Sequence, residues 1–339
     1  MNSLYKNKKV LLISVGLIAV IFLTFLISLN IGTYKIEPMD VIKTLVGSGT
    51  SSDELVIFKL RLPRIIIAIL VGTALAVSGT ILQCVTKNDL ADSGILGINS
   101  GAALFVVMYI YFMNGNVYDG ISNLTIFTMP IVALAGAIVG AMLIYLLSMS
   151  KGTIKPSRLL LVGIGINVAF TSFLTIFQLK FTTQEFNRVM AWTSGSLWGT
   201  SWNYVIAILP LIVTVLCIIF YKSRYLDILN LGDETATGLG IDVEKERRKL
   251  LIYSVILAGV STAVAGSISF LGLIAPHIGR KLVGPKHKNL IPVSSLIGTV
   301  IILISDTISR NLIAPMEIPV GIIISIIGVP YFIYLMLSN

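Results

Sequence analysis

The sequence is short of charge: Asp, Glu, Lys and Arg make up only 12% of its 339 residues, against about 25% in a typical soluble domain. Hydrophobic residues account for 55%, which is more apolar surface than a soluble core of this size absorbs. Each membrane-spanning helix needs roughly 20 apolar residues, so the length allows about ten crossings. The composition excludes an ordinary soluble protein and predicts an all-α polytopic membrane protein with a single transmembrane domain, residues 1–339.

Cysteine is also scarce. Cys84 and Cys217 both lie inside apolar runs, so neither a disulfide framework nor a thiolate metal site is expected. A phosphate-binding loop of the form GxxxxGK[ST] is absent as well, so any energy from ATP must come from a partner chain. We expect no cofactor, no metal and no catalytic residue. The net charge of +9 is spread over loops and does not predict binding to nucleic acid.

Nine long apolar runs divide the sequence. The first, Val10 to Leu29, follows Lys6, Lys8 and Lys9 and is too long for a signal peptide. We interpret it as a retained transmembrane helix with its positive flank in the cytoplasm. The other runs cover residues 65–85, 95–113, 121–149, 159–179, 204–221, 250–279, 290–309 and 318–337.

Lysine and arginine are unevenly distributed between the two sides of such a bundle, with an excess on the side of the amino terminus. The two basic segments 222–249 and 280–288 can share that side only if the run 250–279 crosses twice. Gly266, Gly272 and Pro276 allow its second crossing to be a short or broken helix. We therefore predict ten crossings with both termini cytoplasmic; nine crossings, with the last part inverted, is the alternative. The basic side comprises residues 1–9, Lys87, 151–158, 222–249 and 280–288.

The charged loop 222–249 is interrupted by several glycines, a pattern typical of short amphipathic helices that lie against a cytosolic partner, or of a solvated linker. On the other side, Arg61 and Arg64 precede the second run and Arg310 follows a later one. Exposed arginines there could pair with acidic side chains of a soluble partner, bind an anionic ligand, or extend to the membrane interface.

Three further features admit two interpretations each. Asp306 is the only carboxylate within an apolar run; it favours either an ion pair with Arg310, one helical turn away, or a role in a transport path. His277 follows Pro276 without a nucleophilic serine pattern, which favours a structural hydrogen bond or a helix-end role over catalysis. The tryptophans are expected at the outer interface, as anchors or as part of a gate: Trp192, Trp198 and Trp202.

A series of short motifs runs from Arg61 to Leu337. The motifs are RLPR at 61–64, GTALAVSG at 72–79, Gln83, NDLADSGILG at 88–97, WTSGSL at 192–197, LGD at 231–233, FLGLIAPHIGR at 270–280 and EIPVG at 317–321. In this order they resemble the FecCD-type permeases of ABC importers for iron chelates, haem and cobalamin. The resemblance departs at Asp89 and Ser93, where the family usually has proline, and at 286–288, where Lys-His-Lys replaces Asp-His-Arg. Loss of proline should make the 86–94 connection less rigid.

The resemblance implies a type II ABC importer bundle in the bacterial cell membrane that translocates an iron(III)-siderophore. Its partners would be a second permease, identical or different, two cytosolic ATP-binding subunits and an extracellular substrate-binding lipoprotein. Haem or cobalamin are alternative substrates, and residues 94–101 slightly favour a hydroxamate siderophore. An ion-coupled secondary transporter would need buried carboxylates, and an intramembrane enzyme a nucleophile with its base.

The resemblance also implies roles for individual residues. Docking of the binding protein is expected at Arg61, Arg64 and Arg310. Coupling to the ATPase is expected at Leu231, Gly232, Asp233, Ala236, Leu239 and Gly240. Candidate pathway or gate residues are Gln83, Asn88, Gly97, Trp192, Ser194, Gly195, Pro276 and His277.

Overall fold

The apolar runs are helical, because a backbone surrounded by hydrocarbon must satisfy its own hydrogen bonds. The computed structural model describes residues 2–32, 34–94, 96–113, 123–150, 153–154, 156–314 and 316–338. Its elements are α1 (Asn2–Asn30), α2 (Pro38–Leu45), α3 (Ser51–Glu54), a π-helical turn η1 (Leu55–Arg61), α4 (Leu62–Thr86), α5 (Ile98–Phe112), α6 (Asn123–Ser148), β1 (Met149–Ser150), β2 (Thr153–Ile154), α7 (Pro156–Gln178), α8 (Thr183–Thr193), α9 (Trp202–Tyr221), α10 (Ser223–Asn230), α11 (Asp233–Gly238), α12 (Val243–Ala265), α13 (Leu271–Val283), α14 (His287–Asn311) and α15 (Val320–Ser338).

The described helices reproduce the predicted spans. Eight of the described helices are long and apolar enough to cross a membrane, and α5 is a shorter apolar helix. Helix α13, with 13 residues, is the short helix that follows the break in the run 250–279. The antiparallel pair β1 and β2 forms a tight connection between α6 and α7. Ile95 and Ile121, where two predicted runs begin, lie outside the described residues, as do Lys151 and Lys155 of the basic side.

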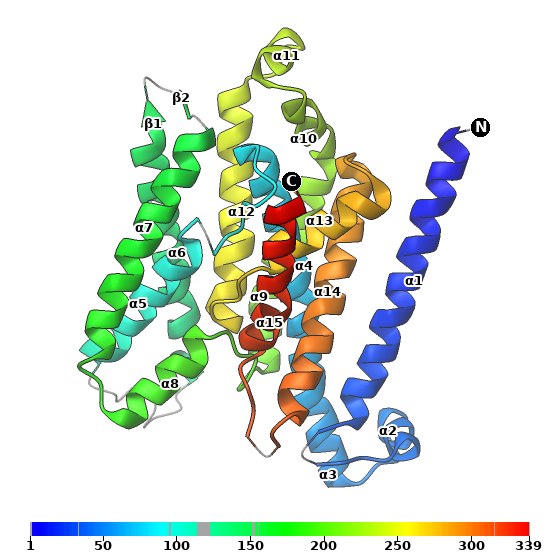
Figure 1. Cartoon of the computed structure of the whole chain (residues 1–339). Helices are drawn as coiled ribbons and strands as arrows, with labels where there is room; N and C mark the ends of the chain where they lie inside the picture. The colour runs from blue at the N-terminus through cyan, green and yellow to red at the C-terminus, as the bar shows by residue number, and fades with distance from the viewer. Residues whose placement is uncertain are drawn as a thin grey trace.

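The run 250–279 is broken as predicted, but the break falls at Gly266, whereas Gly272 and Pro276 lie inside α13. Gly266 has φ +69°, and a Cβ there would lie 2.0 Å from the carbonyl oxygen of Trp192, so only glycine fits. The chain turns back through residues 266–270 and α13 returns toward the end from which α12 came (Figure 1).

Both predicted cytoplasmic loops lie at the same end of the bundle. At the start of α14, the backbone N–H of His287 donates to Asp227 of α10 at 2.8 Å. Figure 1 shows the two termini at this end, together with α10 and α11, while α2, α3 and α8 lie at the opposite end. Two termini at one end (Figure 1) agree with an even number of crossings, such as the predicted ten.

Helix α4 is the most buried of the long spans and packs against α12, α13 and α14. Glycine pairs let the backbones approach where these helices cross, as is common between membrane helices. A Cβ on Gly79 would lie 1.8 Å from the carbonyl oxygen of Gly272 in α13. A Cβ on Gly298 of α14 would lie 2.4 Å from the carbonyl oxygen of Gly72. The core of the bundle therefore depends on small residues in α4.

Candidate functional site

A groove lined by hydroxyl groups, which we call the hydroxyl groove, lies between the end of α8, the break 266–270 and α15. It encloses about 650 Å³. Among the described residues no charged side chain lines it, so a ligand there would meet weak, neutral contacts. The lining residues are Thr193, Ser194, Ser267, Ser269, Gly321, Ile322, Ser325, Ile326, Val329 and Pro330.

Two glycines bring the walls of this groove together. Gly195 has φ +81°, and a Cβ on it would lie 2.9 Å from the carbonyl oxygen of Ser267. A Cβ on Gly321, at the start of α15, would lie 2.2 Å from the carbonyl oxygen of Ser194. The backbone N–H of Gly321 donates to the carbonyl oxygen of Gly195 at 3.0 Å. The WTSGSL and EIPVG motifs thus meet through direct backbone contact.

The structure brings together only part of the predicted pathway set. Ser194 lines the hydroxyl groove, Gly195 forms its wall, and the carbonyl oxygen of Trp192 packs against Gly266. The groove serines Ser267 and Ser269 were not predicted. Their signal in the sequence is weak, because only the fold shows that they lie in the break 266–270 and not in a helix.

The other predicted pathway residues lie apart from the groove. Gln83 donates to the carbonyl oxygen of Leu273 at 3.3 Å, and its own side-chain oxygen accepts a hydrogen bond from Arg280 at 3.0 Å. Asn88 accepts from the backbone N–H of Leu90 at 2.8 Å and so forms a turn. These contacts fix the end of α4 and the connection that follows it.

Three more predicted residues lie within helices or at a helix start. Gly97 precedes α5 with φ +74°. Pro276 is buried inside α13. The ring nitrogens of His277 are buried, and among the described residues neither has a hydrogen-bond partner. The ring packs edge-on against Tyr331, with centroids 5.8 Å apart.

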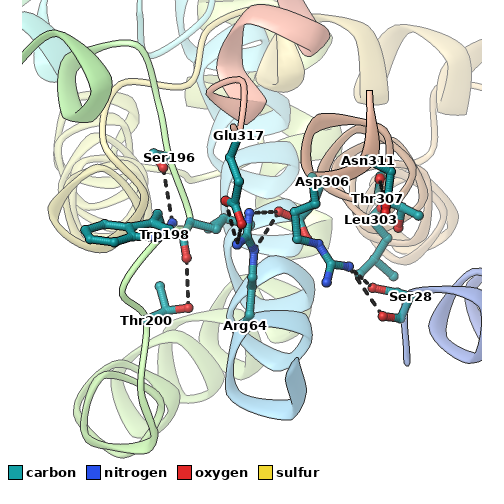
Figure 2. A network of polar contacts seen from close by, with 12 residues as sticks. Ser28, Arg64, Ser196, Trp198, Thr200, Leu303, Asp306, Thr307, Asn311 and Glu317 are labelled. Atoms are coloured by element: carbon teal, nitrogen blue, oxygen red, sulfur yellow. Dashed lines mark hydrogen bonds and ion pairs between the residues drawn. The ribbon is translucent and has the colours of Figure 1, made fainter. Parts of the chain in front are cut away.

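A buried charge cluster joins α4, α14 and the segment before α15. Arg64 donates to Asp306 from Nε at 2.9 Å and to Glu317 from Nη1 at 2.9 Å. Figure 2 shows Arg64 between these two carboxylates. Arg310 Nε lies 3.2 Å from the other oxygen of Asp306, which confirms the predicted ion pair. Asp306 is fully buried and is shared by two arginines.

The expectation that the three arginines are exposed is wrong. Arg61 is 5% exposed, Arg64 8% and Arg310 7%. Arg61 donates to the carbonyl oxygens of Leu29 and Tyr34, and so satisfies an acceptor left open at the end of α1. Charges withdrawn from water need such partners, and here they come from helices distant in sequence. Their role in docking stays a prediction.

At the opposite end, the loop 222–249 contains the predicted short helices, α10 and α11. Ala236 of α11 is fully buried, whereas Leu231 and Leu239 are 64% and 61% exposed. Gly232 and Gly240 flank α11 at positive φ. The segment therefore presents two apolar side chains on a surface outside the bundle.

Asp233 binds this segment to two membrane helices. Its carboxylate lies 2.7 Å from Lys87 Nζ, at the end of α4, and 2.9 Å from Arg247 Nη2 in α12. Partial burial by itself disfavours the charged carboxylate, but the hydrogen bonds from Lys87 and Arg247 hold the pKa of Asp233 below its ordinary value. The contact therefore remains charged at neutral pH. Neither partner of Asp233 was predicted, because Lys87 is 146 positions away and Arg247, 14 positions away, lies on a different helix.

The connection after α4 has an ion pair where the resembled family usually has proline. Asp89 pairs with Arg280 of α13. A contact between side chains thus restrains a segment that a proline would restrain through its own backbone.

The sequence model of the FecCD transport family matches residues 19–338. The chain is 52% identical to the iron(3+)-hydroxamate import system permease protein FhuG of Bacillus subtilis, over 98% of each chain. It is 37% identical to the iron-uptake system permease protein FeuC of the same species, over 95% of this chain and 96% of that one. A solved inward-facing structure, assigned to a metal-chelate type ABC transporter, matches 96% of this chain and 99% of its own with a TM-score of 0.82 and 29% identity.

Proposed function

This chain belongs to the FecCD transport family, and from that membership we propose that it imports an iron(III)-hydroxamate siderophore. It is the membrane-spanning permease subunit of an ABC importer, and it assembles with a partner permease and an ATPase. The observation that carries the choice of substrate is the 52% identity to FhuG along nearly the whole of both chains.

The lining of the hydroxyl groove is suited to a bulky substrate whose metal ion is enclosed by its own ligand. A ferric chelate keeps its metal ion within the ligand's own oxygen atoms, so a pathway for it needs no metal ligands of its own. Serine and threonine hydroxyls beside isoleucine and valine suit such a molecule, because they bind it weakly and let it leave. The alternative of an ion-coupled transporter loses support, since both oxygens of Asp306 face arginines.

We further propose the orientation of the subunit in the bacterial cell membrane. Both termini and the α10–α11 segment would face the cytoplasm, where α11 and its exposed leucines would bind the ATPase. A substrate-binding lipoprotein would dock at the opposite end, on the surface supported by Arg61, Arg64 and Arg310. The second permease is either a copy of this chain or a sister chain.

Uptake of radioactive iron tests the substrate. In iron-limited cells that lack this chain, we expect uptake of a ferric hydroxamate siderophore to fall to background and uptake of ferric citrate, haem and cobalamin to stay unchanged. The reason is that the permease is the sole path of its own chelate through hydrocarbon. If uptake of a different substrate is lost, the hydroxamate assignment is wrong but the importer function stands. If uptake of none of these substrates falls, both the substrate and the importer function are contradicted.

Replacing Asp233 with asparagine tests the coupling role. The variant keeps the size of the side chain but loses its charge. The pair with Lys87, whose side chains are 37% and 44% exposed, contributes about 0–1 kcal/mol, and the contact with the buried guanidinium of Arg247 contributes about 1.5 kcal/mol. We expect transport to fall roughly tenfold while the ATPase still binds and hydrolyses ATP. The matched control is Asp40→Asn in α2, which breaks an exposed ion pair with Lys43 at the other end of the bundle and should transport normally. Equal transport by the two variants would rule out a special role for Asp233.

A further inference from the structure

A second groove opens on the membrane-facing surface, away from the hydroxyl groove. It lies between α6 and α12, next to the ends of α4 and α7, and encloses about 450 Å³, within the usual range for ligand pockets. We call it the α6–α12 groove. Its lining residues are Leu82, Leu96, Ile98, Ile138, Ala141, Met142, Ile144, Tyr145, Leu159, Arg248, Leu251, Ile252, Val255 and Ile256.

The α6–α12 groove is suited to a hydrocarbon chain. Apart from Tyr145 and Arg248, every lining residue is apolar, and an apolar cavity does not hold ordered water. Met142 is 61% exposed and Ile252 50% exposed, so the groove is open at its side. Both helices are long and apolar enough to span a membrane, so we place this opening against the lipid of the bilayer.

The mouth of the groove lies at the level of a membrane surface. Tyr145 is near the end of α6 and Leu159 near the start of α7, and the two helices are joined there by the β1–β2 turn. Arg248 lies two residues before Leu250, where the charged first part of α12 gives way to apolar sequence. Figure 1 shows this end of α6, α7 and α12 on the same side as α10 and α11.

Arg248 differs from the basic residues on either side of it. Arg247 is buried and pairs with Asp233 and Glu244, and Lys249 pairs with Glu246. Arg248 is exposed, and within the described part of the chain no carboxylate forms an ion pair with it. The helical repeat turns it away from those pairs and places it above the apolar side chains of the groove, at spacings of three, four, seven and eight residues: Leu251, Ile252, Val255 and Ile256.

We propose that the α6–α12 groove binds one acyl chain of an anionic phospholipid, whose phosphate is bound by Arg248. A guanidinium group binds phosphate oxygens through two parallel hydrogen bonds. Basic pockets between membrane helices on the cytoplasmic side bind acidic lipid headgroups, and this groove lies at the end assigned to that side. The site is independent of which chelate the protein carries.

Native mass spectrometry of the intact transporter tests the proposal. The complex is delipidated in detergent and then supplied with dioleoyl phosphatidylglycerol or, in parallel, with dioleoyl phosphatidylcholine. We expect one phosphatidylglycerol per copy of this chain to be retained in preference to phosphatidylcholine. Arg248→Gln should weaken its retention about fivefold, because it removes one cation at the membrane surface.

Two further variants separate the headgroup from the acyl chain. Ala141→Leu fills the α6–α12 groove without changing charge and should also weaken retention. Lys288→Gln removes an exposed cation at the same end of the bundle, on α14, and should leave retention unchanged. Size-exclusion chromatography shows which variants remain assembled.

Three results would overturn the proposal. The first is equal retention of the two lipids by the unmodified protein. The second is equal weakening by Lys288→Gln and Arg248→Gln, which would mean general attraction to positive charge. The third is a cross-link between the Met142→Cys variant and the second permease, which would mean that protein covers the α6–α12 groove.

Discussion

Replacing Asp306 with asparagine is expected to lower the free energy of unfolding by about 3–5 kcal/mol, the largest loss predicted for this chain. Asp306 is fully buried and faces both Arg64 and Arg310. Arg64 would keep Glu317, but Arg310 would keep only its hydrogen bonds to Ser28 as described contacts. A buried guanidinium without its carboxylate has lost its hydration and has no opposite charge to compensate for it.

Unfolding of the detergent-solubilised protein in rising concentrations of denaturing detergent measures this effect. The matched control is Asp40→Asn in α2, which breaks an ion pair between Asp40 and Lys43 whose side chains are 43% and 55% exposed. An exposed pair contributes about 0–1 kcal/mol, so the control should unfold almost like the unmodified protein. Similar losses for the two variants would mean that the buried charge cluster does not hold the bundle together.

Replacing Gly79 with alanine is expected to destabilise the chain by about 3 kcal/mol, at the upper end for added volume in a packed core. The new methyl group would lie 1.8 Å from the carbonyl oxygen of Gly272, and a backbone atom cannot move aside as a flexible side chain can. Helices α4 and α13 would have to move apart, and this would also weaken the hydrogen bonds from Gln83 to α13.

The same unfolding measurement applies, with Gly165→Ala as the control. Gly165 lies inside α7 on an exposed face, with nothing within 4 Å of its Cβ position. Alanine there should stabilise the helix by up to about 1 kcal/mol, because it favours helix more than glycine does. The two substitutions add the same methyl group and should have opposite signs. A common sign would show that the close approach of α4 and α13 does not limit stability.

The buried arginines change how the docking hypothesis must be tested. Reversing the charge of Arg64 would break the cluster with Asp306 and Glu317, so loss of docking in such a variant could follow from unfolding alone. The useful variants are on the exposed surface around this cluster. The three arginines hold together the ends of α1, α4 and α14 that lie opposite α10 and α11 (Figure 1), and any docking surface at this end depends on that support.

The class of protein, the position of its spans and the broken helix could all be predicted from the sequence. Hydrocarbon forces each span to satisfy its own backbone, so about 20 apolar residues in a row predict a helix whatever lies next to it. The break before α13 is equally local, because Gly266 adopts a backbone conformation that other residues avoid. The ion pair of Asp306 with Arg310 was predictable for the same reason, since one helical turn separates them.

Only the tertiary structure decided which distant residues meet. Arg64 and Asp306 are 242 positions apart, and nothing local to either one predicts that the arginine is buried against that carboxylate. The hydroxyl groove depends in the same way on α8, the break 266–270 and α15, and the Asp233 contacts on α4, α11 and α12. Membrane helices form independently, but their side chains find partners only when the helices pack, and packing is set by shape and polarity along the entire chain.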